Sequence, residues 1–246
     1  MGKLLSATLS GFILFASISL PSYAYEAGEG GGIPDNVEGW NTLWKELMID
    51  IFTIGIVFAA ITLFFLIRYR RKYPSQVGKP AKLSTAAAWG WAIIPAFIFL
   101  ADDLFLAANG WKLWIDQRTI PANAYEVELE SRMWMWSYTY PEGHTTLNEL
   151  RVPVGTPIVL RMKSADVIHS HYMPDFKIKE DSMPGRVTYL WFYPKEVGEH
   201  LVTCAEYCGI LHSGMKGKVI VMPKEEFVAW VKEKTGKTPN ILKGGA

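Results

Sequence analysis

The chain has 246 residues, and half of them are hydrophobic. Its 25 Lys and Arg residues are balanced by 24 Asp and Glu residues, so it lacks the basic excess typical of nucleic-acid binding, and no nucleic-acid partner is expected. The length allows one large domain or a smaller domain with membrane anchors, and the uneven distribution of apolar residues favours anchors. There are only 2 cysteines, too few for a disulfide framework, so their local chemistry becomes the question.

The first apolar stretch has the features of a secretory signal peptide. A lone cation, Lys3, precedes the apolar residues 4–20, and small residues flank Tyr23 just after them. We therefore predict a signal peptide over residues 1–24, followed by a periplasmic segment over residues 25–46. An uncleaved N-terminal anchor helix is the alternative interpretation.

Two further apolar stretches predict membrane-spanning helices. Residues 51–67 and 84–101 contain no charged side chain, and each approaches the roughly 20 residues that cross a hydrocarbon core. We place the helices at residues 47–68 and 84–109. The loop over residues 69–83 carries basic residues and no acidic ones, which marks it as cytoplasmic. A two-pass protein of the bacterial inner membrane results, with both ends and the large C-terminal part in the periplasm.

The pattern changes to short β-prone runs after the second helix. Residues 125–131 alternate apolar and charged side chains, as a half-buried strand does. Many short runs separated by turn residues predict an all-β sandwich or Greek-key barrel over residues 110–222. The other expected runs are 133–140, 150–154, 157–162, 187–192, 200–203 and 218–222. Residues 223–246 then read as an amphipathic helix and a tail.

One loop near the C-terminus concentrates metal-ligating side chains. Cys204, Cys208, His212 and Met215 follow one another closely, and His169 lies 35 residues before the first cysteine. Thiolates, imidazoles and a thioether are the soft donors that select copper. A mononuclear blue-copper site needs one cysteine, whereas two in one loop can bridge a pair of copper ions. The residues therefore predict a binuclear copper site.

Three other interpretations remain open at this point. A disulfide between the two cysteines is possible in an oxidising compartment, and a zinc site with two cysteines and two histidines is chemically reasonable. Neither uses Met215. A copper-delivery or storage protein would need open, exchangeable ligands, whereas the many donors here imply slow release.

The loop Cys204-Ala-Glu-Tyr-Cys208-Gly-Ile-Leu-His212-Ser-Gly-Met215 resembles the CuA signature of subunit II of cytochrome c oxidases. Three other segments resemble that family in order and spacing: residues 134–138, 166–174 and 179–186. The resemblance implies a two-helix transmembrane hairpin followed by a cupredoxin-like Greek-key barrel. It also implies a set of CuA ligands: His169, Cys204, the main-chain oxygen of Glu206, Cys208, His212 and Met215.

The resemblance further implies an electron-transfer role. Electrons would pass from a c-type cytochrome through the copper centre to haem in subunit I, where oxygen is reduced, so this chain would hold no catalytic residue of its own. Trp134 would receive the electron, and the Glu206 side chain would bind a Mg or Mn ion shared with subunit I. Because Trp134 and Trp136 are two positions apart on a strand, at least one is expected to be buried. Asp166 and Asp181 match family positions near subunit I, with loop capping as the alternative.

The sequence departs from the family at three places. Ala88 stands where many relatives have a glutamate that opens a proton path, so protons would enter through subunit I alone. Asp102 and Asp103 lie within an apolar stretch and are expected near the membrane interface, with contact to another subunit as the alternative. His171 replaces a frequent aromatic residue and is expected to be a surface side chain.

Two related functions share most of these features. The CuA subunit of another haem–copper enzyme, such as a nitric oxide reductase, would have the same copper pattern. A non-redox subunit of a quinol oxidase would have the same fold without the intact donor set.

Overall fold

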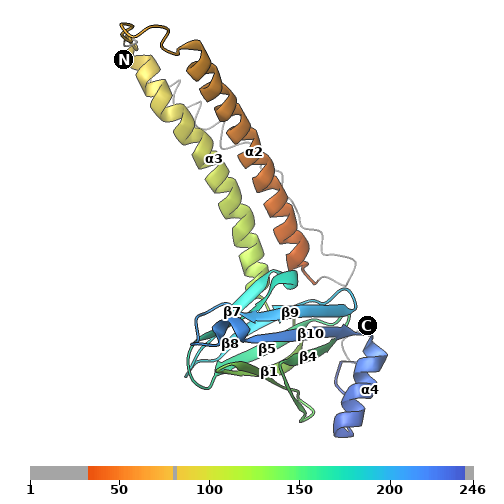
Figure 1. Cartoon of the computed structure of the whole chain (residues 1–246). Coiled ribbons are helices and arrows are strands. Elements are labelled where there is room, and N and C mark those ends of the chain that lie inside the picture. The colour runs from red at the N-terminus through yellow and green to blue at the C-terminus, as the bar shows by residue number, and fades with distance from the viewer. Residues whose placement is uncertain (1–32, 80–81, 242–246) are drawn as a thin grey trace. The chain divides into compact units, whose positions relative to one another are not determined.

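A computed structural model describes residues 33–79 and 82–241, which form two long helices, a β-rich domain and a C-terminal helix (Figure 1). The predicted signal peptide lies outside the described residues. The predicted fold class, a helical hairpin followed by a cupredoxin-like β domain, is confirmed.

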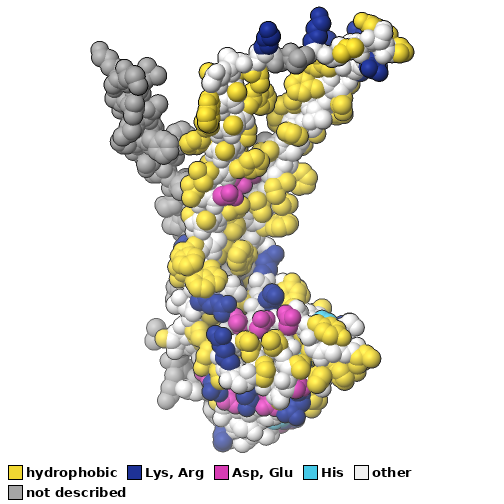
Figure 2. Space-filling model, turned by 90° about the vertical axis from the view of Figure 1, so that its left-hand side faces the viewer, with side chains coloured by type: hydrophobic (Ala, Val, Ile, Leu, Met, Phe, Trp, Pro, Cys, Tyr) yellow, Lys and Arg dark blue, Asp and Glu magenta, His cyan; other side chains and the backbone are white. Residues whose placement is uncertain are grey.

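The two long helices are α2 (Asn36–Arg68) and α3 (Thr85–Arg118). Side-chain oxygens of Asp35 and Ser84 accept hydrogen bonds from the first turns of α2 and α3 and so define where each helix begins. No residue of α2 is buried, and Leu113 is the single buried residue of α3. Both helices are long and apolar enough to cross a membrane. Hydrophobic side chains cover them in Figure 2, as expected for helices in contact with lipid.

The second helix is longer than predicted. Residues 110–118, which the sequence assigned to the β domain, continue α3 without a break. They contain no proline, and the helix ends shortly before Pro121, which disfavours helical geometry in the residue before it. The soluble domain therefore starts after Arg118.

The domain consists of two five-stranded sheets. Their strand orders are β3-β2-β1-β5-β8 and β4-β10-β9-β6-β7. Within them, β1–β5 and β10–β4 are parallel pairs and the other pairs are antiparallel. The strands are β1 (Tyr125–Arg132), β2 (Met135–Thr139), β3 (Thr145–Leu147), β4 (Glu149–Pro153), β5 (Ile158–Ser164), β6 (His169–Met173), β7 (Ile178–Ser182), β8 (Thr188–Phe192), β9 (Gly198–Cys204) and β10 (Lys216–Met222).

The core lies between the two sheets. Alternate residues of β1, including Val127 and Leu129, are fully buried, which confirms the predicted alternation. The C-terminal helix α4 (Lys224–Thr235) adds Phe227 and Val231 to the same core. Two short 3-10 helices, η1 (Pro174–Phe176) and η2 (His212–Gly214), complete the domain.

The site is placed by the pairing of β6 with β9. His171 on β6 is the Cα partner of Cys204, the last residue of β9. The loop that follows Cys204 returns to β10, and the Cys204 N–H closes it by donating to the Met215 carbonyl at 3.2 Å. Two ordered strands therefore fix both ends of the loop that holds the candidate ligands.

Candidate metal centre

Two free thiols form the middle of the candidate site. Cys204 and Cys208 are both buried, and their Sγ atoms lie 3.7 Å apart. The four-residue spacing achieves this because the chain turns back directly after β9. Two sulfurs this close can each bind the same two metal ions and so bridge them.

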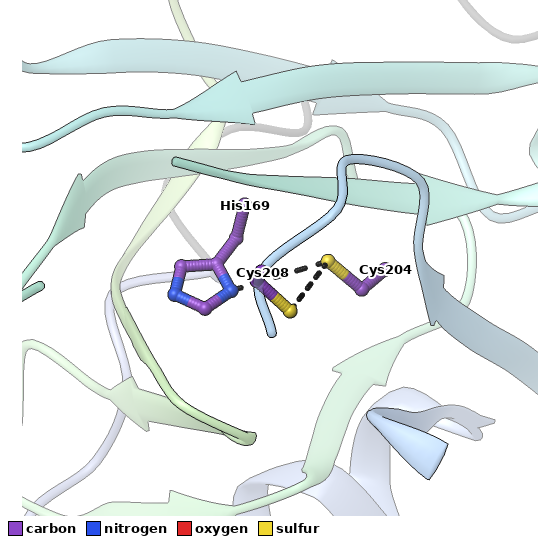
Figure 3. A group of neighbouring side chains, drawn as sticks. All are labelled: His169, Cys204 and Cys208. Carbon is purple, nitrogen blue, oxygen red and sulfur yellow. Dashed lines mark hydrogen bonds between the residues drawn. The ribbon is translucent and has the colours of Figure 1, made fainter. Parts of the chain in front are cut away.

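Each sulfur faces one histidine. Nδ1 of His169, the first residue of β6, lies 3.9 Å from the Cys204 sulfur. Nδ1 of His212, in η2, lies 3.6 Å from the Cys208 sulfur. His169, Cys204 and Cys208 form a compact group whose ligand atoms all lie within 4.8 Å of one another (Figure 3). The histidines thus lie at opposite ends of the sulfur pair.

A thioether and a carbonyl oxygen complete the cluster. The Sδ atom of Met215, which is fully buried, lies 3.7 Å from the Cys208 sulfur. The Cys204 thiol donates to the main-chain oxygen of Glu206 at 3.1 Å. All six positions implied by the resemblance therefore converge. Their mixture of thiol, imidazole, thioether and carbonyl donors fits copper better than zinc, because a tetrahedral zinc site would leave Met215 without a role.

Asp166 fixes the orientation of His169. Its Oδ1 atom lies 2.8 Å from Nε2 of His169, and its carboxylate also accepts from the main-chain N–H groups of Val167 and Met133 at 2.6 and 2.7 Å. Burial lowers the pKa of His169, but hydrogen bonding and charge at Cys204 and Asp166 outweigh it and raise that pKa. A carboxylate that accepts from Nε2 leaves Nδ1 free to bind a metal. Asp166 thus caps the loop and orients the His169 imidazole.

The pKa values of the two thiols are shifted in opposite directions. Burial raises the pKa of Cys204, but hydrogen bonds from His169 and the main chain outweigh it and lower that pKa to about 6. Burial and the adjacent Cys204 raise the pKa of Cys208 to about 12. The physical cause is that two anions 3.7 Å apart repel each other in a buried site. At neutral pH the metal-free pair therefore holds one proton between the two sulfurs.

Two tryptophans lie beside the cluster. Trp136 is fully buried, and its ring meets those of His169 and His171 edge to face, with centroids 6.1 and 5.0 Å apart. Trp134 is partly buried, and its ring comes within 3.4 Å of the position that a Cβ on Gly209 would occupy. The prediction that at least one of the pair is buried is confirmed. Because Gly209 has φ +117°, it is the loop position where glycine is required.

The prediction that His171 is a surface side chain is wrong. His171 is fully buried, its Nε2 lies 2.9 Å from the Tyr138 hydroxyl, and burial lowers its pKa to about 3. The physical reason is alternation: His169 and His171 are two residues apart on β6, so both face the core. Sequence reasoning missed Tyr138 as its partner, although the same two-residue period in β2 places Trp136 and Tyr138 on one face.

Other residues singled out from the sequence lie outside the cluster. Asp181, on β7, forms no side-chain hydrogen bond within the described part of the chain, and the Glu206 side chain is exposed. Ala88, Asp102 and Asp103 lie on α3.

Comparisons with known proteins agree on one family. The model of the cytochrome c oxidase subunit II periplasmic domain matches residues 144–222. An alternative cytochrome c oxidase subunit 2 from Bradyrhizobium diazoefficiens is 29% identical over 228 residues, covering 79% of this chain and 80% of that protein. Cytochrome c oxidase subunit 2 of Cereibacter sphaeroides is 27% identical, covering 75% of each chain. The crystal structure of the periplasmic domain of a Bradyrhizobium japonicum cytochrome oxidase subunit II is 30% identical, with TM-score 0.46, and covers 48% of this chain and 97% of that one.

Proposed function

The chain belongs to the cytochrome c oxidase subunit II family, and on that premise we propose that it receives single electrons at a CuA centre and passes them to haem in subunit I. Family membership makes it a component of a haem–copper oxidase and a membrane protein with a periplasmic domain. The observation that carries the proposal is the convergence of six donor positions around two thiols 3.7 Å apart.

Each donor would have its own part in holding two copper ions. Cys204 and Cys208 would bridge the pair, while His169 and His212 would each bind one ion. Met215 and the main-chain oxygen of Glu206 would complete the two coordination shells. When bound, such a centre supplies a one-electron store whose charge is shared by two ions.

The protein around the donors would keep their geometry constant during electron transfer. The Met215 side chain and the His169 ring are fully buried, so water has little access to that side of the cluster. Asp166 holds the imidazole of His169 in one tautomer and orientation. Since β6, β9 and β10 fix the ends of the loop, little reorganisation is expected when charge arrives.

Trp134 is the proposed site of electron arrival. Its partly buried ring lies against Gly209, the residue directly after Cys208, so it links the domain surface to the ligand loop. A c-type cytochrome is the proposed donor. The exposed Glu206 side chain is available to a Mg or Mn ion at the contact with subunit I.

We also propose the orientation in the membrane. The basic loop between α2 and α3 would face the cytoplasm of a bacterium, so both ends and the copper domain would lie in the periplasm. Oxygen would be reduced in subunit I, and this chain would supply electrons only.

The test is the electron paramagnetic resonance and visible spectrum of the soluble domain from Thr119 onward, refolded with Cu(II). We expect a purple protein with a seven-line hyperfine pattern, because one unpaired electron would couple equally to two copper nuclei. A blue protein with a four-line pattern, or a colourless zinc-only product, would overturn the proposal and favour a structural role.

Two variants connect that spectrum to function. Cys208→Ser removes one bridging sulfur and should abolish the seven-line pattern. Trp134→Phe should leave the pattern unchanged and slow reduction by a c-type cytochrome in the assembled oxidase. Unchanged reduction in Trp134→Phe would remove Trp134 from the electron path without affecting the copper assignment.

A further inference from the structure

An exposed apolar surface lies beside the copper-ligand loop. Four residues form this apolar patch: Met133, Trp134, Val167 and Ile210. Ile210 is 85% exposed, while Met133 and Val167 are 43% and 39% exposed. Trp134, the proposed site of electron arrival, is partly buried. Exposed apolar side chains that gather in one place mark an interaction surface, whereas scattered single ones do not.

Contacts with Gly209 and Asp166 bring the patch together from three parts of the chain. The Sδ atom of Met133 lies 3.6 Å from the position that a Cβ on Gly209 would occupy, beside the tryptophan ring, and Ile210 is the next residue. The Asp166 carboxylate accepts from the main-chain N–H groups of Met133 and Val167 at 2.7 and 2.6 Å. The four side chains therefore lie in one region of the surface.

The acidic side chains nearest to the patch already have partners. Glu130 forms ion pairs with Arg132, which adjoins the patch in sequence, and with Lys163 at 3.2 Å. Hydrogen bonds from these two bases lower the pKa of Glu130, so it is ionised and neutralised by them at pH 7. The Asp166 carboxylate faces His169 and the main-chain N–H groups. Neither acid is available to a lysine of another protein.

The ligand loop adds one exposed acid and one exposed base. Glu206 is exposed and is proposed to serve the contact with subunit I, and Lys216 directly follows the ligand Met215. Around the patch there are thus three acidic side chains, Glu130, Asp166 and Glu206, and three basic ones, Arg132, Lys163 and Lys216. Their formal charges cancel, so the patch has no acidic rim.

This balance decides how a partner can be recognised. A negative rim would attract a positively charged partner and raise its association rate by about 10–10³-fold at low salt. Without such a rim, association depends on the burial of apolar surface, which salt does not screen. The observed surface therefore fits a partner whose contact face is apolar and nearly uncharged.

We propose that the patch docks a c-type cytochrome by apolar contact around the haem edge, without steering by charge. The inference rests on the proposed function and adds the chemical class of the electron donor. Because Trp134 is part of the patch, apolar docking brings the haem edge over this ring. One electron then leaves the ferrous haem iron and enters the oxidised copper pair. A cytochrome with a ring of lysines around its haem edge is the partner that the balanced charges disfavour.

The experiment measures reduction of the copper centre in the assembled oxidase by stopped-flow absorbance. Two cytochromes are compared, one with an apolar haem edge and one with a lysine ring around it. Ionic strength is raised from about 0.01 to about 0.15 M, which shortens the Debye length from about 30 to about 8 Å. We expect the second-order rate constant of the apolar-edged cytochrome to change less than about twofold and to exceed that of the other. A faster reaction with the lysine-ringed cytochrome that slows tenfold or more with salt would overturn the proposal.

A matched pair of variants tests the patch itself. Ile210→Ser should lower the rate constant of the apolar-edged cytochrome by about tenfold, the effect of losing one central apolar contact. Val197→Ser alters a residue that is 58% exposed in the turn before β9, outside the patch, and should leave the rate unchanged. The seven-line copper spectrum is recorded for each protein. An unchanged rate in Ile210→Ser with an intact spectrum would overturn apolar docking.

The spectrum also separates this inference from the proposed function. If the unaltered oxidase lacks the seven-line pattern, the copper assignment fails, and the docking proposal fails with it. If the pattern is present and the rate depends steeply on salt, only the docking proposal fails. The salt dependence needs no variant, so the proposal stays testable even if Ile210→Ser disturbs the copper loop.

Discussion

The hydroxyl of Tyr138 lies 2.9 Å from Nε2 of His171, and both side chains are fully buried. Nδ1 of His171 has no hydrogen-bond partner among the described residues, so Tyr138 is the only group that satisfies this imidazole there. Tyr138→Phe should therefore destabilise the domain by about 1–3 kcal/mol, the cost of an unpaired buried polar group. Urea unfolding of the domain measures the change.

The double variant Tyr138→Phe with His171→Phe gives the control. Removing both polar partners replaces the pair by apolar rings, so it should cost less than Tyr138→Phe alone. Equal or greater destabilisation in the double variant would mean that packing, and not the hydrogen bond, holds this part of the core.

Acid sensitivity should report the burial of His171. Burial lowers its pKa to about 3 in the folded domain, from an ordinary value of 6.5, so the unfolded state binds the extra proton. The contribution of neutral His171 to the free energy of unfolding is therefore fully present above pH 6.5. It falls as the pH drops toward 3, by up to about 1.4 kcal/mol per pH unit. In the metal-free domain, His171→Phe should flatten the difference in unfolding free energy between pH 6.5 and 4.5. An equally steep decline in the variant would assign the acid sensitivity to other groups.

Gly209 and Gly214 should respond differently to alanine. Gly209 has φ +117°, and a Cβ there would come within 3.4 Å of the Trp134 ring. Gly214 has nothing within 4 Å of such a Cβ. Gly209→Ala should cost about 1–3 kcal/mol in backbone strain, whereas Gly214→Ala should be neutral. The free energies of unfolding of the two variants test this difference. Equal values would show that the loop accommodates alanine at position 209 without backbone strain.

Copper binding should release protons in a pH-dependent way. With the pKa of Cys204 near 6 and that of Cys208 near 12, the metal-free pair holds one proton at pH 7.5 and approaches two below pH 6. Both sulfurs must be thiolates to bind copper. The number of protons released by the cysteines should therefore rise from about one to about two as pH falls through 6. A pH indicator in weakly buffered solution measures the total proton release, and Cys208→Ser, which keeps only one of the two thiols, is the control.

Much of the fold followed from local sequence patterns. The strands β1, β2, β4, β5, β8, β9 and β10 were predicted within a few residues, because β-prone runs and flanking turn residues mark them. The strands β3, β6 and β7 were missed; in β6, the polar residues His169 and His171 interrupt the apolar pattern although they face the core. The donor residues were predictable because five of the six lie within one short loop. Their distances, and the partner of His171, depend on the pairing of strands distant in sequence.

Asp166 and Asp181 offer the sharpest test of the site. Both match positions of the family, but only Asp166 contacts a proposed copper ligand. The Asp166 carboxylate accepts from His169, while the Asp181 side chain forms no hydrogen bond with any described residue. Asp166→Asn replaces an ionised acceptor by an amide and loosens the ligand His169, so copper affinity should fall by about 10–100-fold. Asp181→Asn should leave copper affinity unchanged. Titration with a competing copper chelator measures both, alongside the unfolding free energy of each metal-free domain. Equal affinities would reduce Asp166 to a loop cap, whereas a selective loss in Asp166→Asn would establish that its carboxylate positions a copper ligand.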